Sequence, residues 1–208
     1  MNQIKKTVLL LLISTGCYVN AQEKAKKWPD LIMKSYSAWF GSEEGKKIAE
    51  NVLLYQRDIG GWPKNIQMLN VLTEDEKAKL IALKPSGKDC TIDNRATTQE
   101  ILFVSKMYAQ TKEEKYKDSF LRAVNYLLSA QYANGGWPQY FPLKKGYYTH
   151  ITYNDNSMVD VLNVLREVAN QTEYYSIKPP QETVDKAKIE KKKGIQCILK
   201  TQYKQKGV

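Results

Sequence analysis

Apolar side chains recur every three or four positions along most of the chain, with polar side chains between them. This spacing places the apolar residues on one face of a helix. The pattern predicts helices over residues 42–56, 98–110, 112–131, 158–168 and 183–203. No stretch alternates between apolar and polar residues as a half-buried strand does, so we expect an all-α fold.

Two helix starts carry capping signals. Ser42 precedes the first predicted helix and is followed by two glutamates, which are favourable at the positive end of a helix. Thr73 and Glu76 have the spacing of a capping box, which predicts a further short helix over residues 73–83.

A short motif repeats along the chain. The tetrapeptide Gly-Gly-Trp-Pro occurs at residues 60–63 and 135–138, and in both copies a glutamine stands six positions before the tryptophan. A third, degraded copy occupies residues 198–208. Each interval between copies holds two main helices, so the predicted unit is a helical hairpin. Such hairpins bury their apolar faces against neighbours, in an open solenoid or in a closed α/α toroid.

The third copy of the motif falls on the last residues of the sequence and lacks its tryptophan. We therefore expect residues 22–208 to form one incomplete domain, an α/α barrel of helical hairpins truncated at its C-terminus. No linker or shift in composition divides this part of the chain.

The first residues predict export. Lys5 and Lys6 precede a short apolar run over residues 7–13, and residues 19–21 match the small-x-small pattern of a signal peptidase site. Residues 1–21 are thus interpreted as a signal peptide of a secreted or periplasmic protein. A second route is open because Cys17 ends a segment that loosely resembles a lipobox, which predicts a lipid anchor in the outer membrane.

The net charge of the chain is +10, which favours an anionic partner. Outside the cytoplasm, an acidic polysaccharide is a better candidate than nucleic acid. Cys90 and Cys197 remain after the predicted cleavage and could pair, but two cysteines make neither a disulfide framework nor a metal site. His150 is the only histidine, which excludes a zinc centre built on several histidines.

Each Gly-Gly-Trp-Pro motif is followed by an acidic, amide-rich loop that opens the next helix, at residues 91–98 and 150–157. In a hairpin repeat these connections share one rim, so we expect Asp93 and Asp155 on the same face. The alternative role of each aspartate is a helix cap. The carboxylate and amide oxygens here also suit Ca²⁺; they belong to Asp93, Asn94, Asn154 and Asp155.

The side chains around these loops admit two interpretations. Trp62 and Trp137 could be flat platforms for a sugar ring, or core residues that fold back behind the glycines. Lys64, Arg57 and Arg95 could bind carboxylates of an acidic glycan, and arginine can do so with two hydrogen bonds.

Three blocks closely resemble the family-10 pectate lyases. They are YQRDIGGWPKN, TIDNRATTQEILFVSKMY and AQYANGGWPQYFPLKKGYYTHITYNDNSMVDVLNVL, and the resemblance extends over about residues 28–208. It implies an incomplete α/α toroid that cleaves polygalacturonate, the acidic polymer of pectin, by Ca²⁺-dependent β-elimination. In this chemistry, calcium bridges the uronate carboxylate and acidifies the C5 proton, which an arginine removes.

The resemblance also assigns roles to residues. Asp93 and Asp155 match aspartates of the family's active centre that hold calcium and substrate; Asn94 remains a further expected calcium ligand because of its amide oxygen. Among the residues expected to contact substrate, the resemblance suggests Lys64, Arg95 and His150, and the platform interpretation adds Trp62 and Trp137.

The sequence departs from the family in one respect. The family's arginine base lies well after the second aspartate, and none of the chain's four arginines matches it; these are Arg57, Arg95, Arg122 and Arg166. The chain is therefore expected to be inactive or nearly so. Two alternatives stay open: a non-catalytic pectin-binding module, and a glycoside hydrolase with Asp93 and Asp155 as general acid and base.

Overall fold

The structure is a computed structural model that describes residues 27–203. Within this range it has seven α-helices and no β-strand, which confirms the predicted all-α class. The helices are α1 (Trp28–Lys34), α2 (Glu43–Tyr55), α3 (Glu74–Leu83), α4 (Thr98–Thr111), α5 (Glu114–Ser129), α6 (Ser157–Asn170) and α7 (Gln181–Thr201).

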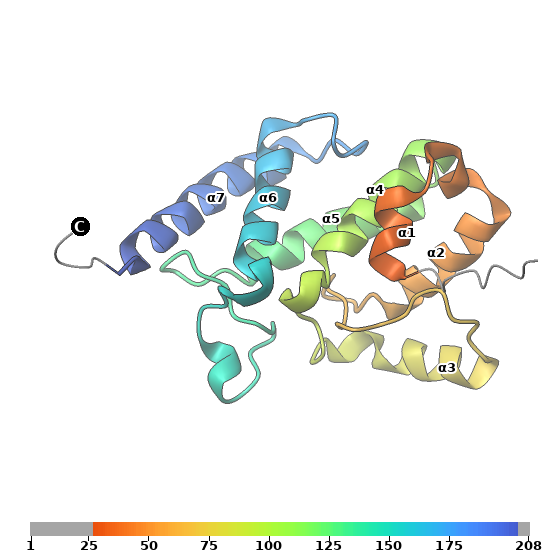
Figure 1. Ribbon diagram of the computed structural model, residues 1–208, viewed down its shortest axis with the longest axis horizontal. Coiled ribbons are helices and arrows are strands. Elements are labelled where there is room, and N and C mark those ends of the chain that lie inside the picture. Colours follow the sequence, from red (N-terminus) through yellow and green to blue (C-terminus); the bar gives the residue numbers. More distant parts are fainter. Residues whose placement is uncertain (1–26, 204–208) are drawn as a thin grey trace, which may run out of the picture.

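The helices form hairpins, as the repeat predicts. α4 packs along α5, α6 packs along α7, and α5 also contacts α7 (Figure 1). The predicted apolar stripes are buried in these contacts; for example, Phe120 and Val124 of α5 and Val161 and Leu165 of α6 have no exposed surface. Both predicted caps are present, because Ser42 accepts a hydrogen bond from the backbone of Gly45 and Thr73 forms a capping box with Glu76.

Two N-terminal elements were not predicted. Helix α1 and a 3-10 helix over Ser37–Gly41 lie against α4. The ring of Trp28 packs 4.8 Å from that of Phe103, and its indole N–H donates to the buried carboxylate of Glu100 at 2.7 Å. Burial raises the pKa of Glu100 to about 7. These elements are too short to show a periodic pattern, and long-range contacts hold them in place.

The Gly-Gly-Trp-Pro motif is a buried corner of the repeat. The side chains of Trp62 and Trp137 are fully buried. Each indole N–H donates to the backbone carbonyl ten residues earlier, in Val52 at 2.7 Å and in Leu127 at 2.8 Å. The two corners are thus built in the same way, with the tryptophan folded back onto the helix that leads into the corner.

The repeated spacing between glutamine and tryptophan has a structural reason. Gln56 Nε2 donates to the carbonyl of Gly60 in its own corner (2.9 Å) and to that of Ser119 in α5 (3.0 Å). Gln131 makes the equivalent pair of bonds to Gly135 (2.9 Å) and to Glu190 in α7 (2.9 Å). Each glutamine therefore fastens its corner to the second helix of the following hairpin.

The backbone of each corner lies so close to the second helix of the following hairpin that only glycine fits at the first position of the motif. Gly60 has a φ of +104°, and a Cβ atom there would lie 2.2 Å from the carbonyl oxygen of Arg122. Gly135 has a φ of +92° and would meet the carbonyl oxygen of Lys193 at 2.3 Å. The first glycine of the motif thus serves both a left-handed backbone and a backbone-to-backbone contact.

The described residues include both cysteines that follow the predicted signal peptide. Cys90 and Cys197 are both buried and unpaired. The predicted signal peptide over residues 1–21, the anchor at Cys17 and the end of the third motif copy lie outside the described residues. None of the helices between residues 27 and 203 is long and apolar enough to span a bilayer.

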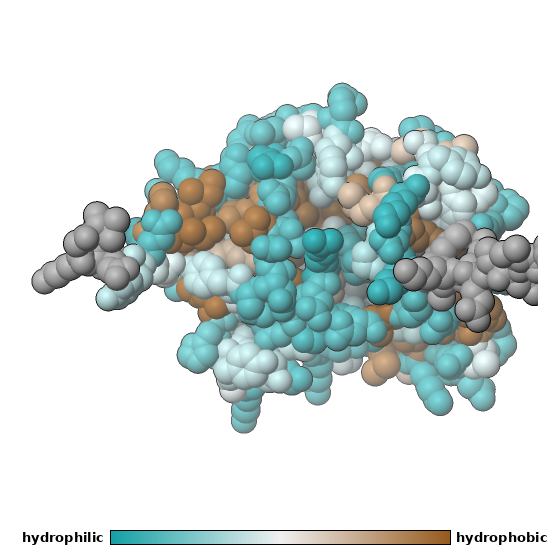
Figure 2. Space-filling model, viewed as in Figure 1, coloured by the Kyte–Doolittle hydropathy of each residue, from teal (hydrophilic) through white to brown (hydrophobic). Residues whose placement is uncertain are grey.

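Hydrophobic side chains are exposed along α7. Figure 2 shows brown side chains over this helix, at the left of the view, whereas the lower centre is hydrophilic. The exposed apolar residues of α7 include Ile189, Ile195 and Leu199.

Candidate functional site

The two acidic loops lie side by side. The first forms a 3-10 turn over Asp93–Arg95 directly before α4, and the second forms one over Asn154–Asn156 directly before α6. The two turns are in contact, and the first also contacts α6. The N-terminal ends of α4 and α6 consequently point to the same region, at the lower centre of Figure 1. The structure thus places both loops on one face. We call the surface formed by the turns Asp93–Arg95 and Asn154–Asn156 the rim.

The two loops have matching backbone conformations, but their aspartates stand at positions that differ by one residue. Asn94 has φ 51° and ψ 36°, and Asp155 has nearly the same values, φ 52° and ψ 29°. The backbone N–H of Thr91 donates to the Trp62 carbonyl, and that of Thr152 donates to the Trp137 carbonyl. Asp155 therefore corresponds to Asn94, and Asp93 corresponds to Asn154.

Asp93 lies in a closed polar environment. It is only 3% exposed, and its Oδ2 accepts hydrogen bonds from Lys64 Nζ and Gln139 Nε2, both at 2.5 Å. Lys64 and Gln139 follow the Trp-Pro of the first and second corners respectively, so equivalent positions of the two repeats hold one carboxylate. The other oxygen, Oδ1, is buried without a hydrogen-bond partner.

The ion pair also affects Lys64. Its hydrogen bond with Asp93 is the largest of the effects that raise the pKa of the lysine above its usual value. The Lys64 side chain is 28% exposed, so a charged ammonium group remains accessible beside the buried carboxylate.

Asp155 differs from Asp93 because it is exposed, as are its neighbours Asn154 and Asn156. Its Oδ2 accepts a hydrogen bond from Asn154 Nδ2 at 3.1 Å. Asn94, on the adjacent loop, is exposed as well and donates to Asn65 Oδ1 at 3.0 Å. The rim therefore presents one accessible carboxylate surrounded by amide side chains.

These oxygen atoms would supply some, but not all, of the ligands of a calcium ion. Asp93 Oδ1 lacks a partner, Asp155 is accessible, and the neighbouring amides supply hard oxygen ligands. However, the described residues contain no cluster of three or more His, Cys, Asp or Glu side chains that could hold a metal. Since Ca²⁺ takes six to eight oxygens, further ligands would have to come from water or from a bound carboxylate.

Arg95 is the one arginine that lies on the rim. Its Nε is 3.9 Å from Asp160 Oδ2, a distance too long for a hydrogen bond, and its side chain is 59% exposed. The other arginines have closer partners: Arg57 pairs with Asp89, Arg122 donates to Gln56, and Arg166 pairs with Glu167.

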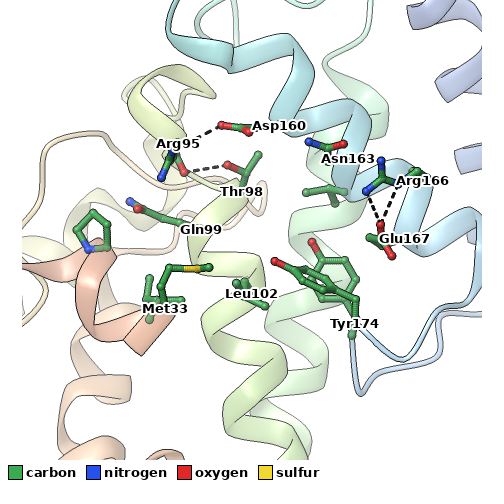
Figure 3. Close-up of a pocket in the computed structure, with 14 residues that line it drawn as sticks. Met33, Arg95, Thr98, Gln99, Leu102, Asp160, Asn163, Arg166, Glu167 and Tyr174 are labelled. Atoms are coloured by element: carbon green, nitrogen blue, oxygen red, sulfur yellow. Dashed lines mark hydrogen bonds and ion pairs between the residues drawn. The ribbon is translucent and has the colours of Figure 1, made fainter. Parts of the chain in front are cut away.

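Arg95 also borders a cavity of about 310 Å³ between α1, α4 and α6 (Figure 3). Gln99, Asp160 and Asn163 line it, together with Tyr174. Burial raises the pKa of Asp160, while the positive charge of Arg95 opposes this shift. The cavity thus continues inward from the rim with both polar and aromatic walls.

The platform interpretation of Trp62 and Trp137 is wrong. A ring with no exposed surface cannot stack on a sugar, and both indoles are fully buried and hydrogen-bonded to the helix before them. They are core residues of the corners. His150, in contrast, is exposed at the start of the second loop.

Replacing Trp62 by phenylalanine tests this correction. We expect the free energy of unfolding to fall by about 2 kcal/mol, because the smaller ring leaves a void and the Val52 carbonyl loses one of its two donors, keeping only the backbone N–H of Gln56. Binding of an acidic polysaccharide should not change. Chemical denaturation and a binding titration would check this, and weaker binding with unchanged stability would restore the platform interpretation.

Gln139 is a residue that the sequence analysis missed. Its bond to Asp93 spans 46 residues, so no local pattern reveals it. The repeat itself could have indicated it, because Gln139 occupies in the second corner the position that Lys64 occupies in the first.

Comparison with known proteins gives the family. The sequence matches the family model described as pectic acid lyase over residues 56–208. No curated protein matches the chain.

Among solved structures, the fold resembles a family 10 polysaccharide lyase from Cellvibrio cellulosa, with a TM-score of 0.66 and 34% sequence identity. This match covers 87% of the present chain and 51% of the lyase. A mutant of that lyase in complex with trigalacturonic acid matches equally well and is covered to 52%. The chain thus spans about half the length of these structures, and it matches half of an α/α toroid. On these grounds the chain belongs to the pectic acid lyase family.

Proposed function

We propose that this chain carries the uronate- and calcium-binding rim of a pectate lyase, a class of enzyme that cleaves polygalacturonate by β-elimination. The described residues bind the uronate, and none of them is assigned as the base that removes its proton. The observation that supports this proposal is the contact between the Asp93–Arg95 and Asn154–Asn156 turns, which brings carboxylates, amides and cations to one rim.

The rim contains cations that suit the uronate carboxylate and oxygen atoms that suit the calcium ion. Lys64 and Arg95 are the accessible cations that can bind a uronate carboxylate. Asp155, Asn94 and the unpartnered Oδ1 of Asp93 are the oxygens that would hold Ca²⁺. When bound, the ion would neutralise the carboxylate and stabilise negative charge that develops on the sugar.

The residues around Asp93 have a positioning role. Lys64 and Gln139 both bind Oδ2, so the carboxylate cannot turn and Oδ1 keeps one direction. Lys64 is at the same time placed beside the accessible surface of the rim. One buried aspartate therefore orients both a cation and an oxygen ligand.

The reaction itself needs a base that removes the C5 proton of the uronate. The electron pair of that bond forms the C4=C5 double bond, the C4–O bond breaks, and the leaving oxygen takes a proton. Arg57 pairs with Asp89, Arg122 donates to Gln56, Arg166 pairs with Glu167, and Arg95 faces Asp160. We therefore expect the 208-residue chain to bind polygalacturonate with little or no turnover.

A direct assay tests this function. The purified chain is titrated with polygalacturonate with and without Ca²⁺, and ultraviolet absorbance of the C4=C5 bond is followed in the same samples. The expected result is calcium-dependent binding without a steady rise in absorbance. A steady rise that EDTA abolishes would establish the lyase and refute the expected inactivity, whereas absence of binding would refute the proposal.

The hydrolase alternative is disfavoured by the surroundings of Asp93. A general acid or base must reach the sugar or a water molecule, but Asp93 is only 3% exposed and its Oδ2 is held by Lys64 and Gln139. Appearance of reducing ends without ultraviolet absorbance, and without sensitivity to EDTA, would support hydrolysis instead.

A further inference from the structure

A cluster of tyrosine and lysine side chains lies on the connection between the second corner and the second acidic loop. We call Tyr140, Lys144, Tyr147 and Tyr148 the tyrosine–lysine cluster. The segment includes a 3-10 helix over Tyr147–Thr149 and projects at the lower left of Figure 1, below α6. None of these four residues was assigned a role by the sequence.

Lys144 contacts the rings of two tyrosines, and the third tyrosine stacks on one of these. Lys144 Nζ lies 4.8 Å from the ring centroids of both Tyr140 and Tyr148. Tyr140 and Tyr148 meet edge to face at 5.3 Å, and Tyr147 stacks on Tyr148 at 4.1 Å with an angle of 35° between the planes. Contacts of a cation with aromatic faces and between rings stabilise such an arrangement.

The outermost ring is accessible. Tyr147 is 66% exposed, although one of its faces is covered by Tyr148. Because Tyr147 stacks on Tyr148, and Lys144 in turn lies over Tyr148, the ring is held in place before any ligand arrives. A preformed aromatic surface costs less conformational entropy on binding than a mobile one.

The cluster is joined to the rim. Lys64 Nζ, which binds Asp93, lies 5.9 Å from the centroid of Tyr140. The backbone N–H of Gln139, the other residue that holds Asp93, donates to the carbonyl of Tyr148 at 3.1 Å. The pKa of Tyr147 is raised, chiefly by its hydrogen bond with Tyr148, and the charges of Lys64 and Asp93 add smaller effects of opposite sign.

We propose that the tyrosine–lysine cluster is an extended binding surface for an acidic polysaccharide, on which Tyr147 stacks against a sugar ring and Lys144 binds a uronate carboxylate. This inference rests on the proposed function, since the same polymer chain would continue from the rim to the cluster. It assigns to Tyr147 the platform role that the buried tryptophans cannot have.

The chemistry of a uronate polymer fits this surface. A galacturonate ring has C–H groups that can lie against an aromatic ring, while its carboxylate projects from C5. Lys64 and Lys144 border the rings, so the surface is positive as well as aromatic. Single-stranded nucleic acid is also anionic and also stacks on aromatic rings, and the test must separate the two.

The test uses the whole chain and two matched pairs of variants. Tyr147→Ala is compared with Tyr36→Ala, since Tyr36 is 71% exposed and lies outside the cluster. Lys144→Ala is compared with Lys145→Ala, which removes the same charge from the next residue. Affinity for polygalacturonate in Ca²⁺ is measured by calorimetry, with neutral galactan and a thymidine oligonucleotide as competitors.

We expect Tyr147→Ala and Lys144→Ala each to weaken polygalacturonate binding by about five- to tenfold, with both controls close to the unsubstituted chain. Galactan should not compete. All four substitutions are at exposed positions, so thermal unfolding should be unchanged and should confirm that each variant is folded.

Other outcomes would overturn the inference in distinguishable ways. If Tyr147→Ala binds as tightly as Tyr36→Ala while Asp155→Asn loses affinity, the cluster is not a binding surface but the proposed function stands. If the unsubstituted chain does not bind polygalacturonate, both fail. If the oligonucleotide competes as strongly as the polysaccharide and loses affinity with Tyr147→Ala, the surface binds nucleic acid instead.

Discussion

Replacing Gly60 by alanine is expected to lower the free energy of unfolding by about 4 kcal/mol. The new Cβ atom would lie 2.2 Å from the carbonyl oxygen of Arg122, and that oxygen belongs to the backbone of α5 and cannot turn away. The φ of +104° adds the cost of a left-handed conformation for alanine. Urea denaturation of the variant would measure the loss.

Gly146→Ala is the matched control for this prediction. Gly146 also has a positive φ, +96°, but a Cβ atom there would meet nothing within 4 Å. Its substitution should therefore cost only the conformational term, about 1 to 3 kcal/mol, because φ +96° with ψ −156° lies in a region that glycine alone adopts readily. Equal losses for the two variants would show that the backbone angle decides the effect and that the contact between the corner and α5 does not.

Replacing Asp155 by asparagine is expected to weaken calcium-dependent binding of polygalacturonate by about a hundredfold, or about 2.7 kcal/mol. Asp155 is the accessible carboxylate of the rim, and an amide has no charge to offset that of the ion. Because the side chain is exposed, stability should change by less than about 0.5 kcal/mol. Calorimetry with and without Ca²⁺ separates the two effects.

A double variant shows whether the position of this charge matters. Asn154→Asp combined with Asp155→Asn moves the carboxylate by one residue and keeps the net charge. Since residue 154 corresponds to Asp93 in the first loop and residue 155 to Asn94, we expect the double variant to stay weak. Full recovery of affinity would mean that general negative charge, and not the placement of Asp155, holds the ion.

The hairpins could be predicted because their information is local. Apolar residues at helical spacing located α2, α4, α5, α6 and α7 to within a few residues, and Ser42 and Thr73 cap their helices as expected. The repeated glutamine and tryptophan marked the corners correctly, although their bonds to the following hairpin became visible only in the structure.

The site could be predicted only in part. Asp93 and Asp155 were expected on one rim, and the contact of the two turns agrees with this geometry. Their different environments were not foreseen, because matching aspartate to aspartate hides the shift of one residue. Asn and Asp both tolerate the left-handed conformation at positions 94 and 155, so the sequence alone does not show which residues are equivalent.

Burial and long-range partners account for what the sequence missed. A tryptophan after two glycines suits a surface platform as well as a core, and only the neighbouring helix decides between them. Likewise, the partner of Asp93 in the second corner comes from another repeat. Tyr147 stacks on Tyr148, and Lys144 lies over Tyr148, in a loop whose sequence has no periodic pattern.

The shift of one residue between the two acidic loops has a consequence for how a polymer can lie on the rim. The backbones of the two loops are near copies, but one carries its carboxylate inward at Asp93 and the other outward at Asp155. The accessible carboxylate therefore lies at one loop rather than between the two. In the proposed complex, an ion held by Asp155 would lie nearer to one end of the bound segment, which favours one direction of the polymer over the other.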